Sequence, residues 1–169
     1  KIWCNNDSLT IEGYYNGTEY EINNFFFTNP KYGLNGIWTE RPTIETANGS
    51  TTIIGNDLNQ ILAGGNETND SIIGGIGNEW FSGWKGNDSL FGGDGDDWMY
   101  GQPGNDLLFG GTGSDLLSGG GGNDTLNSND GADYLEGNGG NDLLNGGSGS
   151  DTYYFTAGAG NDTIISVDD

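Results

Sequence analysis

A nine-residue period runs through most of this chain and constrains its fold more than any other feature. Aspartate returns at every ninth position from Asp88 to Asp151. With units numbered from Gly74, position four is always glycine, and position one is glycine everywhere except at Ser128. Position eight is always a large apolar residue. Residue types that recur at the same positions of every nine-residue unit predict a stack of similar structural units.

Composition alone would favour a disordered acidic linker. Of the 169 residues 34 are glycine, only 32% are hydrophobic, and the formal net charge is −21. Chains of this kind generally bury too little apolar surface to fold. A disordered linker, however, does not keep three sequence registers over so many units. The periodicity therefore favours a folded repeat array.

The unit reads G-G-x-G-x-D-x-U-x, where U is a large apolar residue. This nonapeptide resembles the calcium-binding repeat of the RTX (repeats-in-toxin) proteins, the haemolysin-type family. The resemblance runs from Gly64 to about Asp162. It implies an all-β fold, a right-handed parallel β-roll in which two nonapeptides form one coil.

The residue types of the unit suit calcium. Calcium takes about six to eight oxygen ligands and tolerates irregular geometry. Glycine lets the backbone turn tightly with its carbonyl groups facing inward, and each aspartate adds a charged oxygen. One turn cannot supply enough ligands, but two stacked turns can. Because stacked carboxylates repel one another without a cation, we expect calcium binding to drive folding.

If turns two units apart stack, the acidic residues form two rows of candidate calcium ligands. Row one holds Glu79, Asp97, Asp115, Asp133 and Asp151. Row two holds Asp70, Asp88, Asp106, Asp124, Asp142 and, after a two-residue insertion, Asp162. Backbone carbonyl ligands are expected at positions one and four, from Gly74, Gly77, Gly83, Gly86, Gly92, Gly95, Gly101, Gly104, Gly110, Gly113, Gly119, Gly122, Gly131, Gly137, Gly140, Gly146 and Gly149. We expect about six to eight ions, with weaker sites at Glu79 and Asp70 and none at Gln60.

Residues 1–54 differ from the repeats, because glycine is scarcer there and aromatic residues gather. Segments 8–15 and 18–27 have strand character, and Asn16–Gly17 between them is a hairpin-turn signal. This part also resembles the haemolysin-related segment found beside RTX blocks. We therefore expect a β-rich N-terminal cap in residues 1–54 and the β-roll in residues 55–169. The open C-terminal end of the roll is expected to be covered by Tyr153, Phe155, Ile164 and Ile165.

Position seven of alternate units predicts an aromatic column on the outside of one sheet, formed by Trp80, Trp98 and Tyr134 with Leu116 among them. Exposed aromatic patches can mark a recognition surface, here for a glycan or a peptide. The column can equally pack against the N-terminal segment or a neighbouring domain. Both interpretations stay open at this stage.

Several other functions are disfavoured. Only four Lys and Arg stand against 25 Asp and Glu, which argues against nucleic-acid binding. The absence of histidine removes His-dependent catalytic triads, and the periodic carboxylates leave no isolated acid pair, so we do not expect an enzyme. A single cysteine, Cys4, permits no intrachain disulfide. No apolar run approaches the length of a membrane span.

The family resemblance implies a setting for the module. It implies a bacterial protein exported by a type I system and found outside the cell or on its surface, such as a toxin or an adhesin. The chain begins at Lys1 rather than at a methionine, so we expect it to be part of a longer protein. Its expected role is to fold on calcium and stabilise that parent protein.

Overall fold

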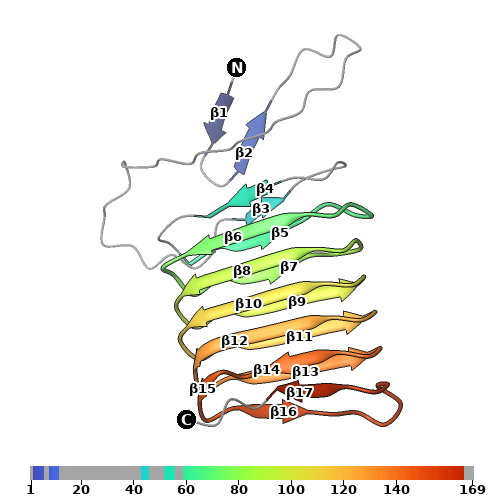
Figure 1. Ribbon diagram of the computed structural model, residues 1–169. Helices are drawn as coiled ribbons and strands as arrows, with labels where there is room; N and C mark the ends of the chain where they lie inside the picture. Colours follow the sequence, from blue (N-terminus) through green and yellow to red (C-terminus); the bar gives the residue numbers. More distant parts are fainter. Residues whose placement is uncertain (1, 6–7, 12–42, 46–51, 56–58, 166–169) are drawn as a thin grey trace.

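The computed structural model describes residues 2–5, 8–11, 43–45, 52–55 and 59–165. Every regular element in these residues is a β-strand, and the described part of the chain contains no helix. Strands β3 to β17 form a parallel solenoid whose coils stack one below another along the sequence (Figure 1). The all-β parallel roll expected from the repeat is therefore confirmed.

Two parallel sheets make up the roll. Sheet I has the order β16-β13-β11-β9-β7-β5-β3, and sheet II has the order β17-β14-β12-β10-β8-β6-β4, with β15 paired beside β12. The strands of sheet I are β3 (Thr43–Glu45), β5 (Ile61–Ala63), β7 (Trp80–Ser82), β9 (Trp98–Pro103), β11 (Leu116–Gly121), β13 (Tyr134–Gly139) and β16 (Thr152–Tyr154). The strands of sheet II are β4 (Thr52–Ile54), β6 (Ser71–Gly75), β8 (Ser89–Asp94), β10 (Leu107–Thr112), β12 (Thr125–Gly131), β14 (Leu143–Asn145), β15 (Ser148–Gly149) and β17 (Thr163–Ile165).

The strand register follows the sequence period. Leu107 of β10 lies opposite Ser89 of β8 on one side and Thr125 of β12 on the other. From β3 to β14 successive strands belong alternately to the two sheets, so two nonapeptides complete one coil. Near the C-terminus Leu143 pairs with Thr163, which places the two-residue insertion within the last coil, as the sequence predicts.

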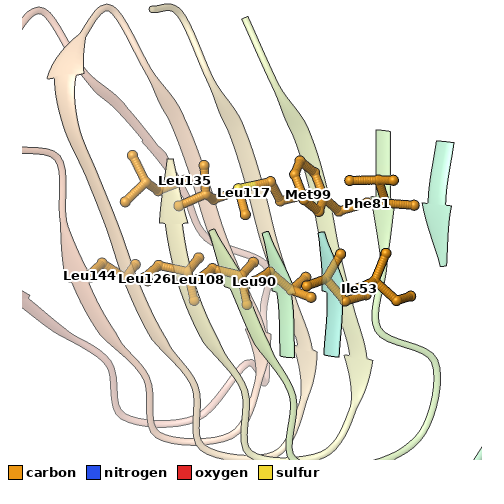
Figure 2. Packing of buried hydrophobic residues seen from close by; sticks show 11 residues of the cluster. Ile53, Phe81, Leu90, Met99, Leu108, Leu117, Leu126, Leu135 and Leu144 are labelled. Atoms are coloured by element: carbon orange, nitrogen blue, oxygen red, sulfur yellow. The ribbon is translucent and has the colours of Figure 1, made fainter. Parts of the chain in front are cut away.

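The core is narrow, because each strand from β4 to β14 contributes one inward-facing apolar side chain to the core cluster. Position eight of every unit points inward, because side chains alternate between the two faces of a strand. Figure 2 shows two facing lines of these residues, with Phe81, Met99, Leu117 and Leu135 in one and Leu90, Leu108, Leu126 and Leu144 in the other. All of them are fully buried. With so little apolar surface per coil, the packing of the turns must contribute much of the stability.

The C-terminal end of the roll is less covered than the sequence suggests. Tyr153 packs against the core cluster as expected. Phe155, Ile164 and Ile165 were expected to cover the open end as well, but their exposed fractions are 48%, 44% and 42%. Ile164 does stand opposite Leu144. It stays exposed because no further described coil packs against it.

The N-terminal residues are described only in part. β1 (Ile2–Asn5) and β2 (Ser8–Ile11) form an antiparallel pair, while the predicted turn at Asn16–Gly17 and strand 18–27 lie outside the described residues. β3 and β4 pair in parallel with β5 and β6, so both sheets begin within residues 1–54. The division into a cap and a roll at residue 54 stays a prediction. In the described ranges no helix is long and apolar enough to cross a membrane.

Candidate metal centre

The acidic side chains form the two rows that the nine-residue period predicts. In row two the backbone N–H of Asp88 donates to Oδ1 of Asp106, and that of Asp106 donates to Oδ1 of Asp124, at 2.8 Å each. The same link joins every neighbouring pair in both rows, from Glu79 to Asp151 in row one and from Asp70 to Asp162 in row two. Each turn is thus held to the next by a carboxylate oxygen.

From Asp88 to Asp142, the second carboxylate oxygen of the row aspartates accepts no hydrogen bond. The acidic residues of the two rows from Asp70 to Asp142 are at most 3% exposed. The Oδ2 atoms of Asp88, Asp97, Asp106, Asp115, Asp124, Asp133 and Asp142 are buried without a hydrogen-bond partner. A buried anionic oxygen without a partner is costly. A row of them indicates that a group of positive charge belongs in the turns.

Burial strongly raises the pKa values of several aspartates in the rows. Loss of solvent raises the pKa of Asp97 to about 8 and those of Asp106 and Asp115 to about 7. It raises the pKa of Asp88 and Asp124 to about 6. The backbone hydrogen bond to each carboxylate lowers the pKa, and the neighbouring acid in the row raises it further. Near neutral pH the rows therefore bind protons readily when no metal is present.

Backbone carbonyl oxygens converge on the same places. A methyl group built at Gly101 would lie closer than 3.0 Å both to Oδ2 of Asp106 in its own turn and to the carbonyl oxygen of Gly119 in the next. Gly83 and Gly92 show the same pair of oxygens around the same point. One carboxylate oxygen and one carbonyl oxygen thus meet beside the glycine at position one. Only a residue without a side chain leaves this space open.

Position four brings a second carbonyl close to the neighbouring coil. A methyl group built at Gly104 would overlap the carbonyl oxygen of Gly86. Gly104 also has a positive φ of 155°, which side chains disfavour. The expected glycines at this position therefore line the turns with their carbonyl groups stacked on the glycines of the next coil.

The two ends of row one depart from the repeat. At the N-terminal end Gln60 occupies the acid position and is buried. Its Oε1 would lie 2.8 Å from a methyl group built at Gly55, so an uncharged amide replaces the carboxylate there. At the C-terminal end the N–H of Gly146 donates to the Tyr153 hydroxyl at 2.8 Å. A side chain of the last coil thus covers the final turn of this row.

A second ladder of hydrogen bonds was missed in the sequence. At position five the side-chain oxygen of Asn105 accepts from the backbone N–H of Asn123, and that of Asn123 accepts from Asn141. The ladder on this edge runs from Asn69 to Asn161. On the other edge the last bond runs from the N–H of Ser114 to Asp96, and the next unit carries Ala132, whose side chain can accept no hydrogen bond. The signal was the frequency of asparagine directly before the periodic aspartate.

These oxygens fit a hard divalent cation. No three His, Cys, Asp or Glu side chains gather into a metal-binding group anywhere in the described residues. A metal in the rows must therefore take most of its ligands from backbone carbonyl groups, with the carboxylates supplying the charge. An all-oxygen ligand set of this kind suits calcium, which tolerates many ligands and irregular angles.

The comparison with known families agrees with this geometry. The model of the RTX calcium-binding nonapeptide repeat matches residues 54–90, 64–99, 85–117, 100–135, 118–153 and 154–166. The fold and the two rows define a calcium-binding parallel β-roll, and the chain belongs to the RTX calcium-binding repeat family. A search of curated proteins finds no match. The family match does not extend into residues 1–53, so the resemblance of that segment to haemolysin-related sequences stays a prediction.

Proposed function

We propose that this chain is a calcium-dependent folding module that stabilises a larger secreted bacterial protein. The eleven acidic residues of the two rows, with the backbone carbonyls of the position-one and position-four glycines, are its proposed ligands. About six to eight ions would fill the gaps between stacked turns. The export of the parent by a type I system, and its nature as a toxin or an adhesin, belong to the same proposal.

The observation that carries the proposal is the line of buried Oδ2 atoms without hydrogen-bond partners, from Asp88 to Asp142. When they are ionised, these carboxylates repel one another along both rows, and the whole chain carries a formal net charge of −21. The core contributes only one side chain per strand. Bound calcium would remove the repulsion and join neighbouring turns, so its binding free energy would become folding free energy.

A module of this kind would respond to the difference in calcium between the inside and the outside of a cell. Extracellular calcium-binding modules typically have dissociation constants of about 10⁻⁴–10⁻³ M. The chain would then stay unfolded where calcium is scarce and fold after export. Stacked sites that share ligands would make this transition cooperative.

The test is a circular dichroism titration of the whole chain with calcium, beside a matched titration with magnesium. We expect a cooperative gain of β signal with calcium alone, because magnesium demands stricter octahedral geometry. A β spectrum that is already complete in chelator and unchanged by calcium would overturn the proposal. An equal response to magnesium would overturn its selectivity for calcium.

A second candidate function rests on the aromatic column of sheet I. Trp80 and Trp98 are 38% and 47% exposed, and their ring centroids lie 5.4 Å apart. Tyr100 extends this cluster, with its ring 5.5 Å from that of Trp80. Flat exposed rings of this kind suit stacking against a neutral sugar or a peptide side chain better than against a polyanion, given the net charge.

Neutral oligosaccharides, followed by intrinsic tryptophan fluorescence of the calcium-loaded chain, test this second function. Trp98→Ala should abolish a response that Trp84→Ala keeps, because Trp84 is equally exposed but lies in a turn outside the column. Both variants must keep the calcium-dependent β signal. No response of the unmodified chain to either neutral sugars or peptides would leave the calcium module as the function.

A further inference from the structure

Ser128 is the one residue at position one of the repeats, from Gly74 to Gly146, that carries a side chain. It is completely buried. Its hydroxyl group donates a hydrogen bond of 2.9 Å to the carbonyl oxygen of Gly146, which occupies position one of the next coil on the same edge. Ser128 also lies beside the carboxyl group of Asp133 in its own turn.

The side chain of Ser128 fills a space that the other turns leave open. Beside Gly92 and Gly110, one coil or two before it, a carboxylate oxygen of the same turn and a carbonyl oxygen of the next turn lie within 3.0 Å of one point. At Ser128 the corresponding groups are Asp133 and the Gly146 carbonyl. Here the serine side chain takes that place, and its hydroxyl group donates to the Gly146 carbonyl.

We propose that the Ser128 side chain replaces a calcium ion in the gap between the turns of Asp133 and Asp151. In this gap a hydrogen bond to Gly146 joins the two turns, where an ion joins them elsewhere. This inference rests on the proposed function and identifies which of its sites is closed. It makes the last gap of row one independent of calcium, while in row two the turns of Asp88, Asp106, Asp124 and Asp142 keep glycine at position one.

The test counts bound calcium per chain by native mass spectrometry and by isothermal titration calorimetry. Ser128→Gly restores the repeat and should bind one ion more than the unmodified chain. Ser128→Ala keeps the methylene group in the gap but removes the hydroxyl, so it should bind the same number of ions as the unmodified chain. Gly110→Ser, the reciprocal change one coil earlier, should bind one ion fewer.

The inference is overturned if Ser128→Gly binds the same number of ions as the unmodified chain. It is also overturned if Ser128→Ala loses an ion, because the hydroxyl would then be a calcium ligand. A circular dichroism titration run on each variant shows whether it folds. Failure of the unmodified chain to bind any calcium would instead refute the proposed function, so the two failures are distinguishable.

Discussion

The backbone N–H of Asp88 donates to Oδ1 of Asp106 at 2.8 Å, across 18 residues of sequence. Asp106 in turn donates its own N–H to Asp124. Each inner aspartate of a row is therefore tied to the turn before it through its side chain and to the turn after it through its backbone. One side chain thus borders two gaps of the row, whereas the last aspartate of a row borders one.

Removing an inner aspartate should harm calcium-dependent folding more than removing the last one. Asp106→Ala leaves the N–H of Asp88 without its acceptor and takes a proposed ligand from two gaps. Asp162→Ala affects one gap at the end of row two. We expect the first variant to have the higher calcium midpoint in a circular dichroism titration. Equal midpoints would contradict the arrangement in which one aspartate supplies ligands to two gaps. Asp106→Asn, which keeps an acceptor but loses the charge, separates the two contributions.

Without calcium the roll should become more stable as the pH falls from about 8 to about 5. The pKa values of Asp97, Asp106 and Asp115 are raised from 3.8 to about 7 or 8 in the fold. The folded state then binds more protons than the unfolded chain, so the free energy of unfolding decreases with rising pH over this window. We expect the β signal in calcium-depleted buffer to grow on acidification.

Calcium should reverse the direction of this pH dependence. At a fixed subsaturating calcium concentration, protons compete with the ion for the same oxygens, so acidification should raise the calcium midpoint. Asp97→Asn removes the group whose pKa is about 8 and should flatten the upper part of the metal-free profile. A metal-free roll that loses β signal on acidification would contradict the assignment.

The close stacking of turns should make position-four glycines intolerant of any side chain. Gly104→Ala places a methyl group on the carbonyl oxygen of Gly86 and requires a positive φ of 155°. We expect it to lower the thermal midpoint of the calcium-loaded chain by many degrees or to prevent folding. Gly121→Ala is the matched control, because nothing lies within 4 Å of a methyl group there. Similar losses in both variants would show that glycine content matters rather than this contact.

The narrow core should be sensitive to single truncations. Leu108 is fully buried between the two sheets, whereas its neighbour Leu107 points outward and is half-buried. Leu108→Ala should reduce the free energy of unfolding by about 2–5 kcal/mol, measured by denaturant titration in saturating calcium. Leu107→Ala should cost clearly less, since it leaves no enclosed cavity. A larger loss at Leu107 would mean that the outer face of sheet II is covered.

The sequence, together with the two-unit coil that the RTX resemblance implies, determined the register and the members of both rows. The period of nine then places Asp106 beneath Asp88 and Leu108 beneath Leu90, because a two-unit coil repeats every 18 residues and strand side chains alternate between the faces. The two-residue insertion before Asp162 could be read in the same way, and the hydrogen bond from Asp142 to Asp162 confirms it. Because the repeat is strict, contacts between residues one coil apart can be predicted from the period of the sequence.

Only the tertiary structure decided what happens where the repeat breaks or ends. Ile164 is exposed because no described coil packs beyond it. The hydroxyl of Ser128 donates to the Gly146 carbonyl oxygen, and this bond requires the two turns to be stacked. The same holds for the two carboxylate oxygens of an inner aspartate such as Asp106. Its Oδ1 accepts a backbone hydrogen bond and its Oδ2 has no hydrogen-bond partner, and no sequence pattern distinguishes the two atoms. Periodicity predicts what is shared by all coils, while these features depend on the particular atoms that meet between two of them.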